Sequence, residues 1–228
     1  MMQKVFTLIG AILLTMGVNA QTTLKVESFK MGIGEQKTIT LDMDNSGFTD
    51  AAAFCCDIYL PEGVEIETDS EGNYNFSIST KDGRSTSPES LIIASAVQSD
   101  EAVRVVCFPT DASAFAGVSG AILNIPLVAS KDLSKGTEEV TIANQEITNT
   151  TGLSTVNPDA SISDLIAFIR SDANSDGDIN ITDVAYVLDD INGASTEGFD
   201  EDAADANRDG EINITDVSLI LDIINSEN

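Results

Sequence analysis

Short apolar runs that alternate with polar positions recur between residues 21 and 160. A two-residue period of this kind, rich in β-branched and aromatic residues, predicts strands, and the glycine, proline and asparagine breaks between the runs predict turns. Because each sheet must bury one face against another layer, about nine such strands predict a two-sheet β-sandwich. The runs lie at 24–29, 36–43, 52–60, 64–67, 74–79, 90–97, 103–108, 121–129 and 139–147.

The pattern changes to a period of three to four residues near the C-terminus. Two apolar stripes at positions i, i+3, i+4 and i+7 predict two amphipathic helices, each with one buried face. Neither helix can bury its stripe alone, so we expect the two to pack antiparallel against each other. The stripes are Val184, Val187, Leu188 and Ile191, and then Val217, Ile220, Leu221 and Ile224.

Residues 161–170 fit both periods. Ile162, Leu165, Ile166 and Ile169 make a helical stripe, whereas residues 166–169 also fit a short strand. We favour a last sandwich strand that leads directly into the helical segment. The predicted organisation is a β-sandwich at residues 21–165 and a small all-α domain at residues 166–228.

One twelve-residue sequence occurs twice in the C-terminal domain, and such repeats are the first signal to look for. Residues 172–183 read DANSDGDINITD and residues 205–216 read DANRDGEINITD; the longer repeats 172–193 and 205–226 agree at 15 of 22 positions. Oxygen-bearing side chains occupy loop positions 1, 3, 5, 9 and 12, and Gly177 or Gly210 occupies position 6. This is the spacing of an EF-hand calcium loop, with Asp in place of Glu at position 12. An acidic turn could match once by chance, but two complete copies argue against chance.

Calcium prefers about 6–8 oxygen ligands at roughly 2.3–2.6 Å, and this spacing supplies them. Position 7 offers its backbone carbonyl, position 9 often acts through a water, and position 12 closes the shell with two oxygens. Three carboxylates per loop repel one another without the ion, so we expect a loosely folded domain when calcium is removed. We predict two calcium ions, held by Asp172, Asn174, Asp176, Asp178, Asn180 and Asp183, and by Asp205, Asn207, Asp209, Glu211, Asn213 and Asp216.

The two loops, each followed by one helix, resemble a type I dockerin over about residues 167–228. The resemblance implies a domain that docks onto a cohesin of an extracellular polysaccharide-degrading assembly such as a cellulosome. Many dockerins carry Ser-Thr at loop positions 10 and 11 as partner contacts, whereas this chain has Ile-Thr in both copies, so we expect a cohesin of another specificity. Apolar helix positions off the stripe add to the expected contact, unless they pack on the connection around Phe199. The candidate partner contacts are Ile181, Thr182, Tyr186, Ile214, Thr215, Leu219 and Ile223.

The sandwich resembles a cohesin-like module, a superfamily shared with some carbohydrate-binding modules, and a generic Ig-like sandwich fits nearly as well. The resemblance rests on residues 34–41 (GEQKTITL), 53–64 (AFCCDIYLPEGV) and 120–127 (GAILNIPL). It implies a receptor for another dockerin, which would make the chain an adaptor. The alternatives are a polysaccharide-binding module, with Tyr59, Tyr74 and Phe76 as a thin aromatic surface, and a spacer.

An apolar run from Val5 to Val18, preceded by Lys4 and followed by Asn19-Ala20, predicts a signal peptide at residues 1–20. The run is too short for a comfortable membrane span. We therefore expect a secreted protein, extracellular or periplasmic. The formal net charge of −27 argues against nucleic acid or an anionic membrane as a partner.

Catalysis is not expected. The chain has no histidine and no tryptophan, which excludes histidine-based triads, histidine-ligated zinc and tryptophan sugar platforms. The acidic residues of the sandwich, Asp57 among them, are expected on a solvated face; a small glycoside hydrolase that uses two of them is the alternative. Cys55, Cys56 and Cys107 allow a Cys56–Cys107 bridge across the sandwich core, although we favour free thiols.

Overall fold

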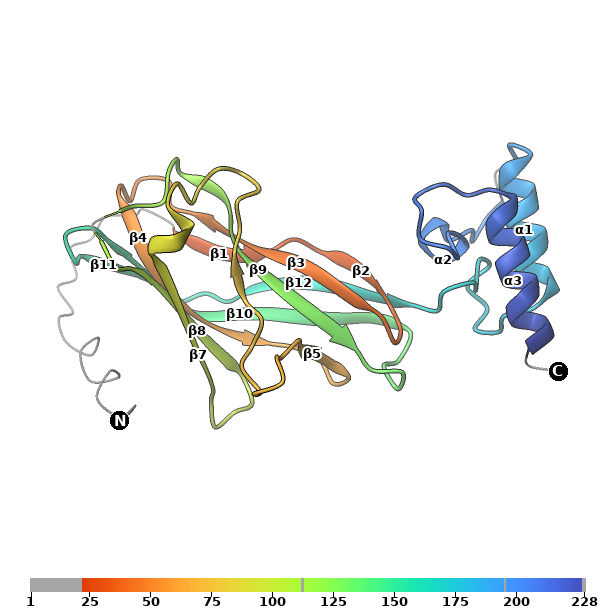
Figure 1. Cartoon of the computed structure of the whole chain (residues 1–228), viewed down its shortest axis with the longest axis horizontal. Helices are drawn as coiled ribbons and strands as arrows, with labels where there is room; N and C mark the ends of the chain where they lie inside the picture. Colours follow the sequence, from red (N-terminus) through yellow and green to blue (C-terminus); the bar gives the residue numbers. More distant parts are fainter. Residues whose placement is uncertain (1–21, 112, 195, 227–228) are drawn as a thin grey trace.

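The computed structural model describes residues 22–111, 113–194 and 196–226. The predicted signal peptide at residues 1–20 lies outside this part of the chain. Two β-sheets pack face to face, and a small helical domain follows at one end of them (Figure 1). Within the described residues, no helix is both long and apolar enough to cross a membrane.

The first sheet is antiparallel and has the order β1-β3-β9-β5, with β6 also paired to β9. The alternating residues of its strands give one buried and one exposed face, as in β3, where Ile39, Leu41 and Met43 point inward. Its strands are β1 (Thr23–Val26), β3 (Gln36–Asp44), β5 (Val64–Ile66), β6 (Ser77–Ile78) and β9 (Ser119–Ala129).

The second sheet has the order β2-β12-β10-β4-β8-β7, with β11 also paired to β10. Its strands are antiparallel except that β2 and β12 run parallel. A short 3₁₀ helix, Pro88–Ser90, precedes β7. The strands are β2 (Phe29–Gly32), β4 (Ala51–Tyr59), β7 (Leu91–Val97), β8 (Val103–Pro109), β10 (Gly136–Asn149), β11 (Ser154–Asn157) and β12 (Ser161–Phe168).

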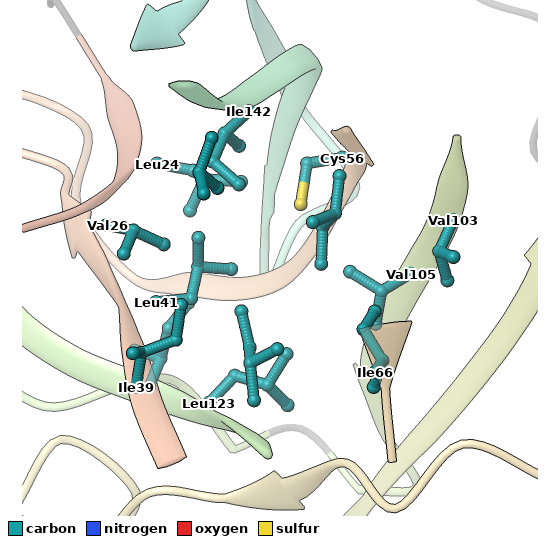
Figure 2. Packing of buried hydrophobic residues seen from close by; sticks show 14 of the residues in the cluster. Leu24, Val26, Ile39, Leu41, Cys56, Ile66, Val103, Val105, Leu123 and Ile142 are labelled. Atoms are coloured by element: carbon teal, nitrogen blue, oxygen red, sulfur yellow. The ribbon is translucent and has the colours of Figure 1, made fainter. Parts of the chain in front are cut away.

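The core lies between the two sheets. Figure 2 shows side chains of the first sheet, such as Leu24 and Leu123, directed toward Cys56, Val105 and Ile142 of the second. All five have 0% of their surface exposed. Burial of a Leu, Ile or Val side chain stabilises a fold by about 1.5–3 kcal/mol, so this cluster is the main stabilising element of the sandwich.

A bulge in β10 ties the two sheets together. The register of β10 against β4 shifts between Ala143 and Glu146, and Asn144 adopts a positive φ of 50°. The bulge turns the Gln145 side chain inward, where its Oε1 accepts the N–H of Leu24 at 2.6 Å. Gln145 is 1% exposed, so this polar contact replaces water for a backbone group of β1.

The predicted two-sheet sandwich with an all-α C-terminal domain is confirmed, with twelve strands in the described residues in place of about nine. The run at 24–29 contains two strands, β1 and β2, because the chain changes sheets at Glu27-Ser28. The run at 74–79 forms only the two-residue strand β6, and β11 was not predicted. The strand interpretation of residues 161–170 is confirmed by β12.

The cysteine geometry differs from the prediction. Cys56 lies on β4 and Cys107 on β8, which are neighbours in the same sheet, so a bridge across the sandwich core was the wrong geometry. All three cysteines are free thiols in the structure, as favoured from the sequence. Burial raises the pKa of Cys55 to about 11 and that of Cys107 to about 12, so both stay protonated and pack as small apolar groups.

The helical domain contains α1 (Ile181–Ile191), α2 (Glu201–Ala204) and α3 (Ile214–Ser226). Helices α1 and α3 lie side by side at the far end of the molecule (Figure 1). Val184 and Val187 of α1 pack with Val217 and Ile220 of α3, and small alanines of the loops complete the cluster. This second core is separate from the sandwich core and far smaller.

Candidate metal centre

The first predicted calcium loop is wrapped around Asp172, which is 1% exposed. Its Oδ1 accepts the N–H of Asp176 at 3.0 Å, and its Oδ2 accepts the N–H of Gly177 at 3.0 Å. Gly177 has a φ of +98°, which a side chain would strain. Position 1 thus organises the first half of the loop, and position 6 permits the turn.

Asp183, at loop position 12, closes the loop and lies in the first turn of helix α1. Its carboxylate accepts the N–H of Asn174 at 3.2 Å and the N–H of Asn180 at 2.8 Å. Asn180 in turn caps α1 by accepting the N–H of Thr182 at 2.9 Å, which completes a capping box. The side chain of Asp183 therefore joins the start of the loop to the start of the helix.

The second loop repeats this hydrogen-bond frame. Gly210 again provides the turn, with a φ of +84°. Equivalent distances differ from those of the first loop by at most 0.2 Å: Asp205 accepts from Asp209 at 3.2 Å and Gly210 at 3.0 Å, and Asp216 accepts from Asn207 at 3.1 Å and Asn213 at 2.9 Å.

The chemistry of the loops fits a hard divalent cation. Asp183 and Asp216 have 0% exposure, and neither forms an ion pair with a lysine or arginine of the described residues. Burial raises the pKa of Asp183, and the nearby Asp172 and Asp176 carboxylates raise it further, against the effect of the backbone N–H groups. A bound cation relieves both causes.

The loop side chains are mainly engaged in hydrogen bonds with the loop itself. Asn174 and Asp176, at positions 3 and 5, contact each other at 2.8 Å, and Asn180 at position 9 caps the helix. Within the described residues no three carboxylates or thiolates converge as a metal cluster. Each donor set mixes carboxylate, amide and backbone carbonyl oxygens, as calcium loops do, so calcium binding requires the side chains at positions 3 and 5 to exchange these hydrogen bonds for the ion.

The candidate partner contacts at loop positions 10 and 11 lie on the surface. Ile181 is 63% exposed and Ile214 61% exposed. The hydroxyls of Thr182 and Thr215 donate to Asn180 and Asn213 of their own loops, at 2.9 and 2.8 Å. The two isoleucines are therefore the freest apolar groups of the loops, whereas the threonines help to cap the helices.

The other three candidate contacts are not exposed as expected. Tyr186, Leu219 and Ile223 are half-buried, and the first two pack against the small helical core with Phe199. Two positions of the predicted buried stripe are exposed in their place, Leu188 at 37% and Ile191 at 41%. Burial is instead greatest at Val187 of α1 and Ile220 of α3, both with 0% exposure.

Contacts between the sandwich and the helical domain were missed from the sequence. Residues 161–228 contain two basic side chains, Arg170 and Arg208, and both bind Glu35 of the sandwich. Arg170 makes a bidentate contact, with Nη2 to Oε2 at 2.8 Å, and Arg208 Nη2 contacts Oε1 at 2.6 Å. Two isolated cations in an acidic domain were the available signal, but nothing in the sequence identified Glu35 as their partner.

Two features favour the binding of Glu35 to these two arginines. Burial opposes its charge, but the hydrogen bonds and charge of Arg170, with those of Arg208, lower its pKa. Its carboxylate lies over Gly32, where a Cβ atom would come within 2.3 Å of it. Gly32 at the end of β2 therefore leaves the space that the ion pair occupies.

Asp57 corrects a second prediction from the sequence. It is 2% exposed, not on a solvated face, and it forms a bidentate ion pair with Arg104 at 2.6 Å for both contacts. Asn144, from the bulge of β10, donates to Oδ2 at 2.7 Å. Although burial acts in the opposite direction, these partners lower the pKa of Asp57, so the carboxylate stays ionised within a structural ion pair.

Comparisons with known proteins agree with this geometry. Residues 170–225 match the family described as dockerin type I domain, whereas no curated protein matches the chain. A chain of a type I cohesin–dockerin complex from Clostridium thermocellum is 12% identical, with a TM-score of 0.50 over 64% of this chain and 99% of that one. A non-cellulosomal cohesin from Archaeoglobus fulgidus is 14% identical, with a TM-score of 0.48 over 65% and 92%. The chain thus carries a type I dockerin domain at residues 170–225, preceded by a two-sheet β-sandwich of cohesin-like fold.

Proposed function

We propose that this protein is a secreted, non-catalytic module that docks through its calcium-loaded dockerin onto a cohesin of an extracellular polysaccharide-degrading assembly. The observation that carries the proposal is the pair of equivalent loops, each with a buried position-12 carboxylate and an exposed isoleucine beside it. Type I dockerins bind calcium generally, and dockerin and cohesin-like modules are non-catalytic types. Secretion rests on the apolar run at residues 5–18.

Two calcium ions are part of this proposal. Positions 1, 3, 5, 7 and 12 of each loop would hold one ion, with position 9 acting through a water because its amide caps the helix. The ion would supply the positive charge that the buried carboxylates of each loop require. The chain's own residues fix the loop shape through Asp172 and Asp205 and carry it into the helices through Asp183 and Asp216.

We expect calorimetric titration of the full-length protein to give two calcium ions per chain, and Asp183→Ala and Asp216→Ala each to remove one. The reason is that each aspartate joins its own loop to its own helix. Asp189→Ala, an equal change of charge at an exposed position of α1 outside the loops, is the matched control and should keep two. A stoichiometry of two in either loop variant would show that the ions bind elsewhere.

The docking surface proposed for the cohesin includes Ile181 and Ile214, the first residues of α1 and α3, and the exposed Leu188 and Ile191 of the same domain. Exposed apolar side chains that lie on one domain, rimmed by polar residues, mark a site of protein interaction. The other candidate contacts are expected to border this surface, since they are engaged within the domain or half-buried. They are Thr182, Thr215, Tyr186, Leu219 and Ile223.

Capture of the full-length protein on immobilised type I cohesin modules tests the docking. The double variant Ile181→Asp with Ile214→Asp should bind about thirtyfold more weakly or worse, because two apolar anchors would become charged groups. Val156→Asp changes an equally exposed apolar residue, at 60%, on β11 of the sandwich and should bind like the wild type. Equal loss in both variants, or capture unaffected by a chelator, would contradict docking through the loops.

One observation favours a second role, in which the sandwich receives the dockerin of another protein. Two adjacent rows on the outer face of the second sheet are largely apolar. The strand registers align Ala94, Val106 and Cys55 in one row and place Ile92 beside Phe108 in the next. Ile92 is 43% exposed and the protonated Cys55 is half-buried. The chain would then be an adaptor whose dockerin binds one protein and whose sandwich binds the dockerin of another.

This face favours a protein over a polysaccharide as the ligand of the sandwich. Tyr74 and Phe76 pack on each other, with ring centroids 5.9 Å apart, and are half-buried against the core. The hydroxyl of Tyr59 donates to Asp100 at 2.6 Å. These rings therefore form no shared exposed platform for a sugar among the described residues. The capture experiment, repeated with immobilised type I dockerin and with immobilised polysaccharide, shows whether the sandwich binds a protein or a polysaccharide.

A further inference from the structure

The two dockerin loops differ in one contact that comes from the other domain. Lys135, in the connection between β9 and β10 of the sandwich, places its Nζ 2.8 Å from Oδ2 of Asp172 and 2.7 Å from the carbonyl oxygen of Ser175. Asp172 is the first residue of loop 1 and is 1% exposed. The equivalent Asp205 of loop 2 has no lysine or arginine bound to its carboxylate within the described residues.

Loop 2 faces a different part of the interface. Arg170 donates to the backbone carbonyls of Asp202 and Asp205, and Arg208 of the loop reaches Glu35. Lys30 of the sandwich binds Asp202 at 2.7 Å and Asp200 at 3.2 Å, both before loop 2 begins. These three basic side chains contact either backbone carbonyls or side chains outside the predicted ligand positions. In the described part of the chain, Lys135 is thus the one basic residue of the sandwich that binds the side chain of a predicted calcium ligand.

We infer that Lys135 makes the two calcium sites unequal, by weakening calcium binding in loop 1 while the dockerin rests on the sandwich. The inference rests on the calcium binding proposed above and adds a regulator from a separate domain. Calcium in loop 1 and the Lys135 contact oppose each other, and linkage makes the opposition reciprocal. Filling loop 1 therefore loosens this contact, whereas the Glu35 contacts remain.

Both possible fates of the contact weaken calcium binding at loop 1. If the ammonium group stays on Asp172 Oδ2, it lies close to the bound ion and repels it. If it leaves, filling loop 1 in a dockerin already folded around calcium in loop 2 must include the loss of an ion pair to a buried carboxylate and of a hydrogen bond to Ser175. In either case the free energy of binding at loop 1 is less favourable than it would be without Lys135, whereas at loop 2 Arg170 contacts the backbone carbonyl of Asp205 and not its carboxylate.

The test is an NMR calcium titration of the full-length protein in chelator-buffered solution. The amide groups of Gly177 and Gly210 each donate to the first carboxylate of their own loop at 3.0 Å, so they report the two sites separately. In the wild type, Gly210 should respond at lower calcium than Gly177. Lys135→Gln should move the Gly177 midpoint roughly tenfold lower in calcium, as expected for loss of one nearby positive charge, and leave the Gly210 midpoint within about twofold.

Two control variants test whether the shift in midpoint is specific to the charge of Lys135. Lys135→Arg keeps the charge and should keep the wild-type order of the sites. Lys131→Gln changes a lysine of the same connection whose stem lies by Gly34, and it should change neither midpoint. An unchanged or higher Gly177 midpoint in Lys135→Gln would overturn the inference with calcium binding intact. If neither glycine responds to calcium in the wild type, the proposed calcium function itself fails.

Discussion

Chelation of calcium from the full-length protein is expected to unfold α1 and α3 while the β-sandwich stays folded. The helical core contains few large buried side chains, chiefly Val184, Val187, Val217 and Ile220, and the buried carboxylates of both loops would be left without a cation. Metal binding supplies folding free energy in such small domains. At a calcium concentration of about 1,000 times Kd, each site contributes roughly 4 kcal/mol, which is most of the stability of a domain this size.

Circular dichroism and amide hydrogen exchange measure this result in different ways. The helical signal should fall and the amides of α1 and α3 should exchange quickly, whereas those of β9 and β10 should keep their protection. Restoring calcium should reverse the change, and magnesium should be a poor substitute because it demands a smaller octahedral shell. If helicity and the melting temperature are the same in a strong chelator, the loops are ordinary turns and the docking proposal must be withdrawn.

Replacement of Arg104 by Met should cause a large loss of stability in the sandwich. The change removes the bidentate partner of Asp57, whose side chain is 3% exposed, and leaves a buried carboxylate with the Asn144 amide alone. Breaking a buried ion pair costs about 3–5 kcal/mol; because the Arg104 side chain is 37% exposed, we expect about 2–3 kcal/mol. Urea unfolding followed by fluorescence of the tyrosines measures the difference.

The pH dependence of this loss has a definite sign. Since Arg104 and Asn144 lower the pKa of Asp57, the pair stabilises the fold above the unfolded pKa of about 3.9. That contribution disappears as pH falls through the lower folded pKa. The wild type and Arg104→Met should therefore differ at neutral pH and converge in acid. Arg104→Lys, which keeps the charge but not the fork, should lie between them, and a difference under 0.5 kcal/mol at neutral pH would contradict a structural role for the pair.

The local features of the fold could be predicted because local chemistry determines them. Alternation identified most strands, and the loop spacing identified the turn at Gly177 and the end of the loop at Asp183. The change of sheet between β1 and β2 could not be seen, because an apolar pattern shows that a segment is buried and not which sheet pairs with it. The same limit applies to β6 and β11, which are too short to give a period.

The predictions that failed depend on contacts between distant parts of the chain. Asp57 appeared to belong to a solvated face because neither Arg104 nor the bulge at Asn144 is near it in sequence. Tyr186 and Leu219 were expected on an exposed face unless they packed on the connection around Phe199, and both are half-buried against the helical core. Lys135 and Glu35 gave no signal at all, since each is far in sequence from the dockerin residues that it contacts.

Strand β12 leads from the sandwich directly into the first dockerin loop (Figure 1). It is an inner strand of the second sheet, paired with β10 on one side and with β2 on the other. Tension applied through a docked partner therefore enters the sandwich along the axis of β12. The hydrogen bonds on both sides are then loaded in shear, all together, and not peeled apart one at a time. Such loading resists a pulling force better than peeling does, because all of these hydrogen bonds must break together.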